Sequence, residues 1–178
     1  GAGSYTLFTY GGTLTYNGLV VGAVPAGYGY VIDTTTVHEV NLAVLSPFQQ
    51  WQMNYFGPGY PINPAAAANA DPDGDGMHNE AEFLAGTNPT NSLSGLRIIS
   101  VLPQGDGLNV TWTTAGGRTN AVQATAGDVG GGYTNNFVDI TTAPHILIDG
   151  NGDTTTNYVD PGGSTNVPAR YYRIRLVP

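Results

Sequence analysis

Short runs of apolar and β-branched residues, each ended by a glycine or proline turn, recur along most of this chain. The sequence has 26 glycines and 12 prolines in 178 residues, well above ordinary usage. Residues 95–178 contain six such runs, and in the last run Tyr172, Ile174 and Leu176 alternate with polar residues. Regular short strands of this kind are typical of a β-sandwich, with Trp112 as its expected anchor. The sequence therefore predicts a mainly β fold.

The first 45 residues show the same pattern without any helical periodicity. Strand-like runs occupy 5–10, 13–24, 28–32 and 37–45, with turns between them. In the fourth run apolar and polar residues alternate, as they do in a half-buried strand. We therefore expect residues 1–45 to form an N-terminal β region.

The one helical region follows at 46–94, which we take as a linker between two β regions, 1–45 and 95–178. Ser46 followed by Pro47 is an N-cap with proline at the first helical position, and Gly57 is a stop signal. We expect a short helix here, and a second one over 79–85 that ends at Gly86. Helices this short need a β-sheet to pack against.

Charge and cysteine content exclude several classes of protein. The chain has 13 acidic and 5 basic residues, a net charge of −8, and its basic residues are all arginine. Nucleic acids and anionic membrane surfaces both require a basic face, so neither is an expected partner. The absence of cysteine excludes disulfides and thiolate zinc sites. No apolar run approaches the roughly 20 residues of a membrane span.

An acidic loop at 71–82 carries the clearest chemical signal. It follows the spacing Asp-x-Asp-x-Asp-Gly, five residues, then Glu, which is typical of calcium loops. Calcium binds 6–8 oxygen atoms, and Gly76 permits the sharp turn that brings them together. The expected ligands are the carboxylates of the three aspartates, the carbonyl of residue 77, the residue at 79 directly or through water, and a bidentate glutamate: Asp71, Asp73, Asp75, Met77, Asn79 and Glu82.

One alternative to a calcium site is a solvated acidic loop that binds no ion. The other is a site for magnesium, which demands strict octahedral geometry. His78 is expected to be solvated rather than a ligand. A weaker candidate for a second calcium site lies at 149–153 together with Asp160. We favour a β-hairpin turn there instead, between 146–148 and 155–159, because Asn-Gly and Asp-Gly pairs are typical of hairpins.

The stretch 71–91, which reads DPDGDGMHNEAEFLAGTNPTN, resembles the calcium loops of thrombospondin type 3 repeats and of dockerins. The longer stretch 46–178 is similar to C-terminal segments of large secreted proteins of Verrucomicrobia. In those segments a Pro-Phe-x-x-Trp helix precedes the loop and a small fibronectin-III-like domain follows it. Residues 5–45 resemble the last rungs of autotransporter-like β-helices. This chain has one clear loop, whereas thrombospondin arrays have many and dockerins usually two, so the resemblance favours a structural calcium.

No catalytic constellation is recognisable. The three histidines are isolated, and no Gly-x-Ser-x-Gly word or phosphate-binding loop occurs. We expect a non-catalytic, calcium-stabilised structural protein, extracellular or on a bacterial cell surface. A self-assembling fibre, in which the uncharged run 4–10 adds to a neighbour's sheet, is our main hypothesis. The alternative is a carbohydrate-binding or adhesive module of a larger secreted protein, with cell-surface glycans as partners. The third hypothesis is that the protein is a hydrolase.

Overall fold

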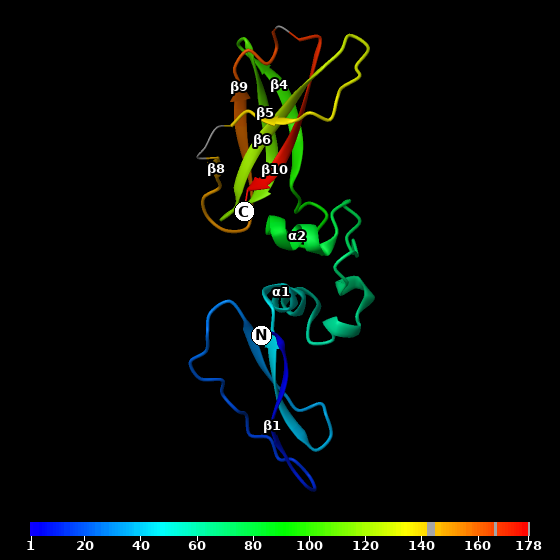
Figure 1. Ribbon diagram of the computed structural model, residues 1–178, viewed down its shortest axis with the longest axis vertical. Helices are drawn as coiled ribbons and strands as arrows, with labels where there is room; N and C mark the ends of the chain where they lie inside the picture. The colour runs from blue at the N-terminus through cyan, green and yellow to red at the C-terminus, as the bar shows by residue number, and fades with distance from the viewer. Residues whose placement is uncertain (142–144, 166, 178) are drawn as a thin grey trace. The chain divides into compact units, whose positions relative to one another are not determined.

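A computed structural model describes residues 1–141, 145–165 and 167–177. Its described residues form three antiparallel sheets and two short α-helices, which confirms a mainly β fold with a short helix (Figure 1). The chain divides into two compact units, Gly1–Ala67 and Ala68–Pro178.

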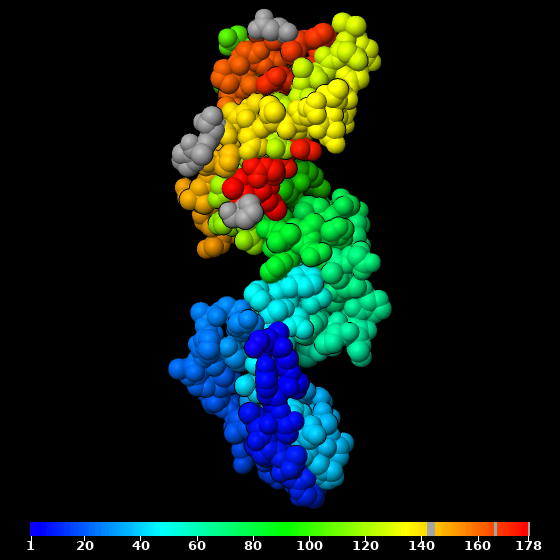
Figure 2. Space-filling model, in the orientation of Figure 1, coloured from blue at the N-terminus to red at the C-terminus, as the bar shows by residue number. Residues whose placement is uncertain are grey.

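The first unit contains a three-stranded sheet in the order β1-β3-β2. Its members are β1 (Gly3–Thr9), β2 (Gly29–Asp33) and β3 (Glu39–Leu45). β3 is central and holds the fully buried Val40, whereas all seven residues of β1 are exposed. The β1–β3 register shifts between Thr6 and Phe8, so that β1 carries a bulge. In Figure 2 the dark-blue residues of β1 lie uncovered on the surface of this unit.

Residues 13–24 form no strand, and that prediction is wrong. Gly12 and Gly18 have φ angles of 79° and 88°, a left-handed conformation that breaks an extended run. Most apolar residues of the segment are exposed, with Val20 at 94 %, so no neighbouring strand is present to hold the segment straight.

Helix α1 (Pro47–Phe56) begins as its sequence predicts. The Ser46 hydroxyl accepts the Gln49 backbone N–H at 3.2 Å, and the Gln49 side chain accepts the Ser46 N–H at 2.9 Å. This reciprocal pair is a capping box, and Pro47 occupies the first turn where its missing N–H costs nothing. The helix ends at Gly57 with φ 74°. Two 3₁₀ turns, Tyr60–Ile62 and Pro64–Ala66, complete the unit.

The second unit is a sandwich of two sheets. One sheet has the order β4-β5-β9, with β5 paired along most of its length on both sides. The other has β6 in the centre, β10 on one side and the two-residue strands β7 and β8 on the other. The bounds are β4 (Arg97–Gln104), β5 (Gly107–Ala115), β6 (Thr119–Gly127), β7 (Val138–Asp139), β8 (Ile146–Leu147), β9 (Asp153–Asp160) and β10 (Ala169–Val177).

The core of this sandwich is built on three fully buried side chains, Val110 and Trp112 from β5 and Val122 from β6. Partly buried residues from both sheets, including Ile98, Tyr158 and Ile174, surround them. The Trp112 indole N–H donates to the buried Asn120 carbonyl oxygen at 2.9 Å, which satisfies the one polar atom of the ring. Trp112 therefore anchors the core as predicted.

The expected hairpin at 146–159 is not formed. β8 pairs with β6, and β9 pairs with β5, so the two segments belong to different sheets. The glycines at 150 and 152 have φ angles of 85° and 74° and turn the chain from one sheet to the other rather than back on itself.

Candidate metal centre

The acidic loop folds around its own carboxylates. Asp71 accepts the backbone N–H groups of Gly74 and Gly76 at 2.9 and 3.0 Å. Asp73 accepts the Asp75 N–H at 3.2 Å, and Asp75 accepts the Met77 N–H at 2.7 Å. Gly74 and Gly76 have φ angles of 74° and 95°, which only glycine adopts cheaply. The Asp-Gly spacing thus produces a tight turn with its carboxylates on one side.

This turn gathers three carboxylates that could hold a metal ion. One carboxylate oxygen from each of Asp71, Asp73 and Asp75 lies within 4.8 Å of the other two. Like charges at this separation repel one another unless a cation lies among them. An Oδ2 atom of Asp73 is buried and has no hydrogen-bond partner. Burial, followed by the nearby charges of Asp75 and Asp71, raises the pKa of Asp73 despite backbone hydrogen bonds that lower it.

Glu82, the last residue of the motif, is fully buried. One carboxylate oxygen accepts the Thr87 hydroxyl at 3.4 Å, and the other has no hydrogen-bond partner. Burial, together with the charges of Asp73 and Asp75, raises the pKa of Glu82 to about 7. Glu82 is not part of the cluster of three aspartates, but a buried carboxylate near their charges is costly without a cation. The donor set therefore fits a hard divalent ion.

The two remaining predicted ligands occupy the turn into helix α2 (Asn79–Ala85). Asn79 is the first residue of that helix, is fully buried, and donates its backbone N–H to the Ala70 carbonyl at 2.9 Å. The ligand roles of the Met77 carbonyl and the Asn79 side chain stay predictions.

His78 has a role that sequence inspection did not identify. Its Nδ1 accepts the Ala81 backbone N–H at 3.4 Å, so it caps the N-terminus of α2. The sequence does carry a signal for this cap, because a polar residue just before an acidic first turn is typical of the N-cap position. At the other end, Gly86 takes the left-handed conformation with φ 78°, as its sequence predicts.

The loop is attached to the chain segment that enters the sandwich. The Leu96 backbone N–H donates to the Met77 sulfur at 3.3 Å, and the Asn91 backbone lies close enough to lower the pKa of Asp73. Gly95 lies so close to Asp75 that an added Cβ would stand 2.8 Å from its Oδ2. Because β4 begins at residue 97, an ion bound in the loop would restrain the start of that strand.

Helix α2 is attached to the same end of the sandwich, because the start of β4 pairs with the end of β5, Arg97 opposite Thr113. The Arg118 guanidinium, in the turn between β5 and β6, donates to the Phe83 carbonyl at 3.2 Å. A side chain at Gly86 would stand 2.7 Å from the Arg118 Nε, so the close approach depends on glycine. The loop and its helix therefore form one structure with the sandwich of the second unit.

The weaker candidate site at 149–160 is not assembled. Asp153 accepts the Ser94 hydroxyl at 2.7 Å, and Asp160 accepts Arg170 Nε and the Tyr172 hydroxyl. These two carboxylates thus have separate partners in the sandwich. Within the described residues, the cluster of possible metal ligands is the aspartate triad of the acidic loop.

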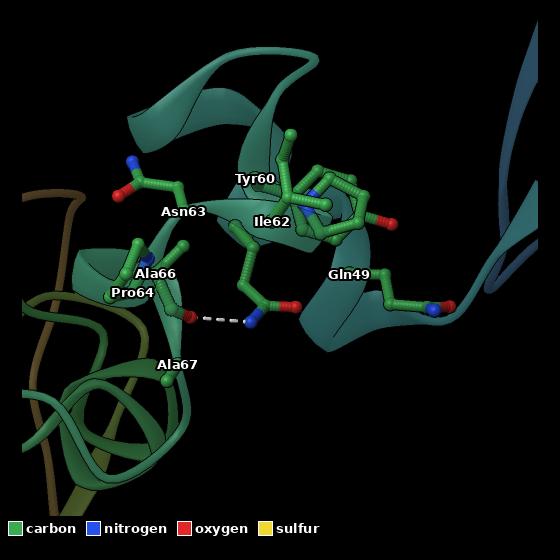
Figure 3. Close-up of a pocket in the computed structure, with 9 residues that line it drawn as sticks. Gln49, Tyr60, Ile62, Asn63, Pro64, Ala66 and Ala67 are labelled. Carbon is green, nitrogen blue, oxygen red and sulfur yellow. Dashed lines mark hydrogen bonds between the residues drawn. The ribbon is translucent and has the colours of Figure 1, made fainter.

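The first unit contains an open pocket of about 520 Å³ beside α1 (Figure 3). Gln49, Gln52 and Tyr60 line it together with prolines and alanines, and the Gln52 amide donates to the Ala66 carbonyl at 2.6 Å. None of the described residues that line it carries an acidic or basic side chain, so the pocket offers no acid–base pair.

Comparison with known proteins finds no matching family model, no curated relative and no similar solved structure. The resemblances to thrombospondin type 3 repeats, dockerins and fibronectin III domains consequently stay predictions. Neither helix in the described ranges has the length and apolar character needed to cross a membrane.

Proposed function

We propose that the protein is a calcium-stabilised, non-catalytic structural protein that works outside the cell. The observation that carries the proposal is the acidic loop, where three clustered aspartates adjoin a fully buried glutamate with an unpartnered oxygen. A loop that places this much negative charge in so small a space gains most from a bound divalent cation.

Calcium suits the donor set better than other ions. The candidate ligands are all oxygen atoms, which disfavours zinc. Magnesium keeps several waters and rarely fills an all-protein cage, whereas calcium accepts 6–8 flexible oxygen ligands. Millimolar extracellular calcium would keep even a weak site filled. An ion that binds only the folded state stabilises it by about 2.7 kcal/mol at 100 times the dissociation constant.

Calcium titration of the metal-free chain, combined with thermal unfolding, tests this proposal. We expect calcium to raise the Tm of the second unit and a chelator to reverse the rise. The double variant Asp73→Asn with Glu82→Gln should lose this response, because it removes two ligand charges. Asp106→Asn, which removes one exposed charge from the β4–β5 turn, is the matched control and should keep the response. If the unmodified chain unfolds identically with and without calcium, the proposal is wrong.

Self-assembly through strand addition is the second part of the proposal. It is supported by β1, whose seven residues are exposed and which pairs with β3 on one side only. Uncovered strand edges are templates for pairing with another chain. We expect the chain with calcium to form filaments visible by electron microscopy, and deletion of 4–10 to prevent them. A chain that stays monomeric at high concentration would exclude the fibre.

Glycan binding is a competing function with one observation in its favour. Tyr5, Tyr28 and Tyr30 line a shallow pocket of about 370 Å³ in the first unit. Exposed aromatic rings are suitable surfaces for sugars. A glycan array on which the chain binds, and Tyr28→Ala does not, would favour an adhesive module over a fibre subunit.

A further inference from the structure

The strand edges of this protein differ in how well they are protected. Natural proteins prevent unwanted pairing with bulges, prolines, very short strands or covering loops. Among the described strands, β4 has a register shift between Ile98 and Ser100 and contains Pro103. β7 and β8 have two residues each, and β2 has five. β9, the long edge strand beside β5, carries a carboxylate at each end, Asp153 and Asp160.

The outer edge of β10 has none of these protections. β10 is nine residues long, contains no proline, and pairs with β6 in an unbroken register from Ala169 to Val177. No other described strand pairs with it. Its three arginines, which would otherwise repel a neighbour, are each bonded within the unit: Arg170 to Asp160, Arg173 to Gln123 and Arg175 to Asp139.

The charge distribution favours β1 as the occupant of this edge. The chain carries a net charge of −8, yet no charged residue precedes Asp33. β1 is therefore a strand that approaches another copy without adding to the repulsion between them. β10 carries three of the five arginines in the chain, so it is the strand richest in positive charge. Because Asp160 and Asp139 balance Arg170 and Arg175, this edge carries little net charge, and an uncharged strand meets it without the electrostatic cost that the rest of the acidic surface would impose.

We propose that the free edge of β1 in one copy pairs with the free edge of β10 in the next copy. This inference rests on the self-assembly proposed above and names the acceptor that it requires. β1 keeps its pairing with β3 and presents Tyr5, Leu7 and Phe8, which are each 45–47 % exposed in the single chain. Each copy then has one donor strand in the first unit and one acceptor strand in the second unit. Such a head-to-tail contact builds an open filament unless its rotation happens to close a ring.

Cysteine cross-linking of the full chain tests this pairing, because the natural sequence has no cysteine. Isotope-labelled donor variants carry Ser4→Cys or Thr9→Cys at the two ends of β1. Unlabelled acceptor variants carry Ala169→Cys or Val177→Cys at the two ends of β10. Ile99→Cys in β4, where the side chain is 51 % exposed, is the matched control. A bis-maleimide spanning roughly 10 Å, about three residues of strand, joins thiols that lie side by side.

We expect labelled–unlabelled cross-links between β1 and β10 positions, at least tenfold above those to residue 99. If β1 runs antiparallel to β10, Ser4 joins Val177 and Thr9 joins Ala169. If the two strands run parallel, Ser4 joins Ala169 and Thr9 joins Val177. Filaments without these cross-links, or with β1–β1 or β1–β4 products instead, would overturn this inference and leave self-assembly standing. A chain that never assembles would overturn both.

A charge placed on β1 gives a second, independent measurement. Leu7→Asp should raise the concentration needed for assembly at least tenfold, because a carboxylate in the middle of β1 would lie among the side chains of the strand it pairs with and lose part of its hydration. Val20→Asp is the control, since it adds the same charge to the same uncharged segment at a side chain that is 94 % exposed and outside any strand. Equal effects of the two substitutions would show that net charge, rather than β1, controls assembly.

Discussion

The two units of this protein bury their apolar residues to very different degrees. The second unit encloses Trp112, Val110 and Val122 completely between two sheets. The first unit has one three-stranded sheet, and β1 leaves Leu7 and Phe8 almost half exposed. Two packed sheets bury the apolar faces that they turn toward each other. A single sheet cannot bury apolar residues on both of its faces.

The comparison teaches that the units rely on different sources of stability. The second unit has a closed core, and under the proposed function a cation bound in its acidic loop would further stabilise the folded state. The first unit depends on local features such as the α1 capping box, and under the proposed self-assembly its exposed strand β1 would be stabilised by a partner. Substitutions in each unit can separate these sources.

The largest expected effect comes from the core of the second unit. Trp112→Ala removes a fully buried ring and its hydrogen bond to Asn120, and should destabilise this unit by about 3–5 kcal/mol. Phe8→Ala in β1, where the ring is 45 % exposed, should cost about 1 kcal/mol or less. Chemical denaturation with hydrogen exchange resolved by peptide measures both. Similar losses for the two substitutions would contradict the comparison.

A smaller effect is expected from the capping box of the first unit. Ser46→Ala removes the side-chain acceptor of the Gln49 N–H and should destabilise α1 by about 1 kcal/mol. Faster hydrogen exchange should be confined to peptides covering 47–56. Ser164→Ala, which removes a hydroxyl that donates to the Asp106 carbonyl in the second unit, is a control that should leave those peptides unchanged. Equal acceleration by both variants would show that the cap does not stabilise α1.

The smallest effect is a pH dependence confined to the second unit. Hydrogen bonds from Arg175, and then from Gln123, lower the pKa of Asp139 from its ordinary 3.8. A carboxyl with a lowered pKa in the folded state contributes stability above its ordinary pKa, and the contribution is lost as pH falls through the folded value. The unmodified chain should therefore lose slightly more stability between pH 5 and pH 2 than Asp139→Asn does. Chemical denaturation measures the free energy of unfolding of both chains at each pH. If the two chains lose the same stability as the pH falls, the Asp139 carboxylate does not stabilise the fold.

Local features of the fold were predictable from sequence, and non-local pairings were not. The cap at Ser46, the stop at Gly86 and most strand positions follow from residues within a few positions of one another. The prediction of a strand over 13–24 failed because apolar residues alone do not supply a partner strand. The hairpin at 146–159 failed because β8 and β9 pair with distant strands, which the turn residues do not encode.

The acidic loop shows where this division lies. Its twelve residues determine by spacing that three aspartates share one turn, because each hydrogen bond of that turn reaches at most five residues. The burial of Glu82, the attachment of the loop near Gly95 and Arg118, and the free edges of β1 and β10 were decided by tertiary structure. Burial and strand pairing depend on residues far apart in the chain, so they exist only after the sheets have assembled.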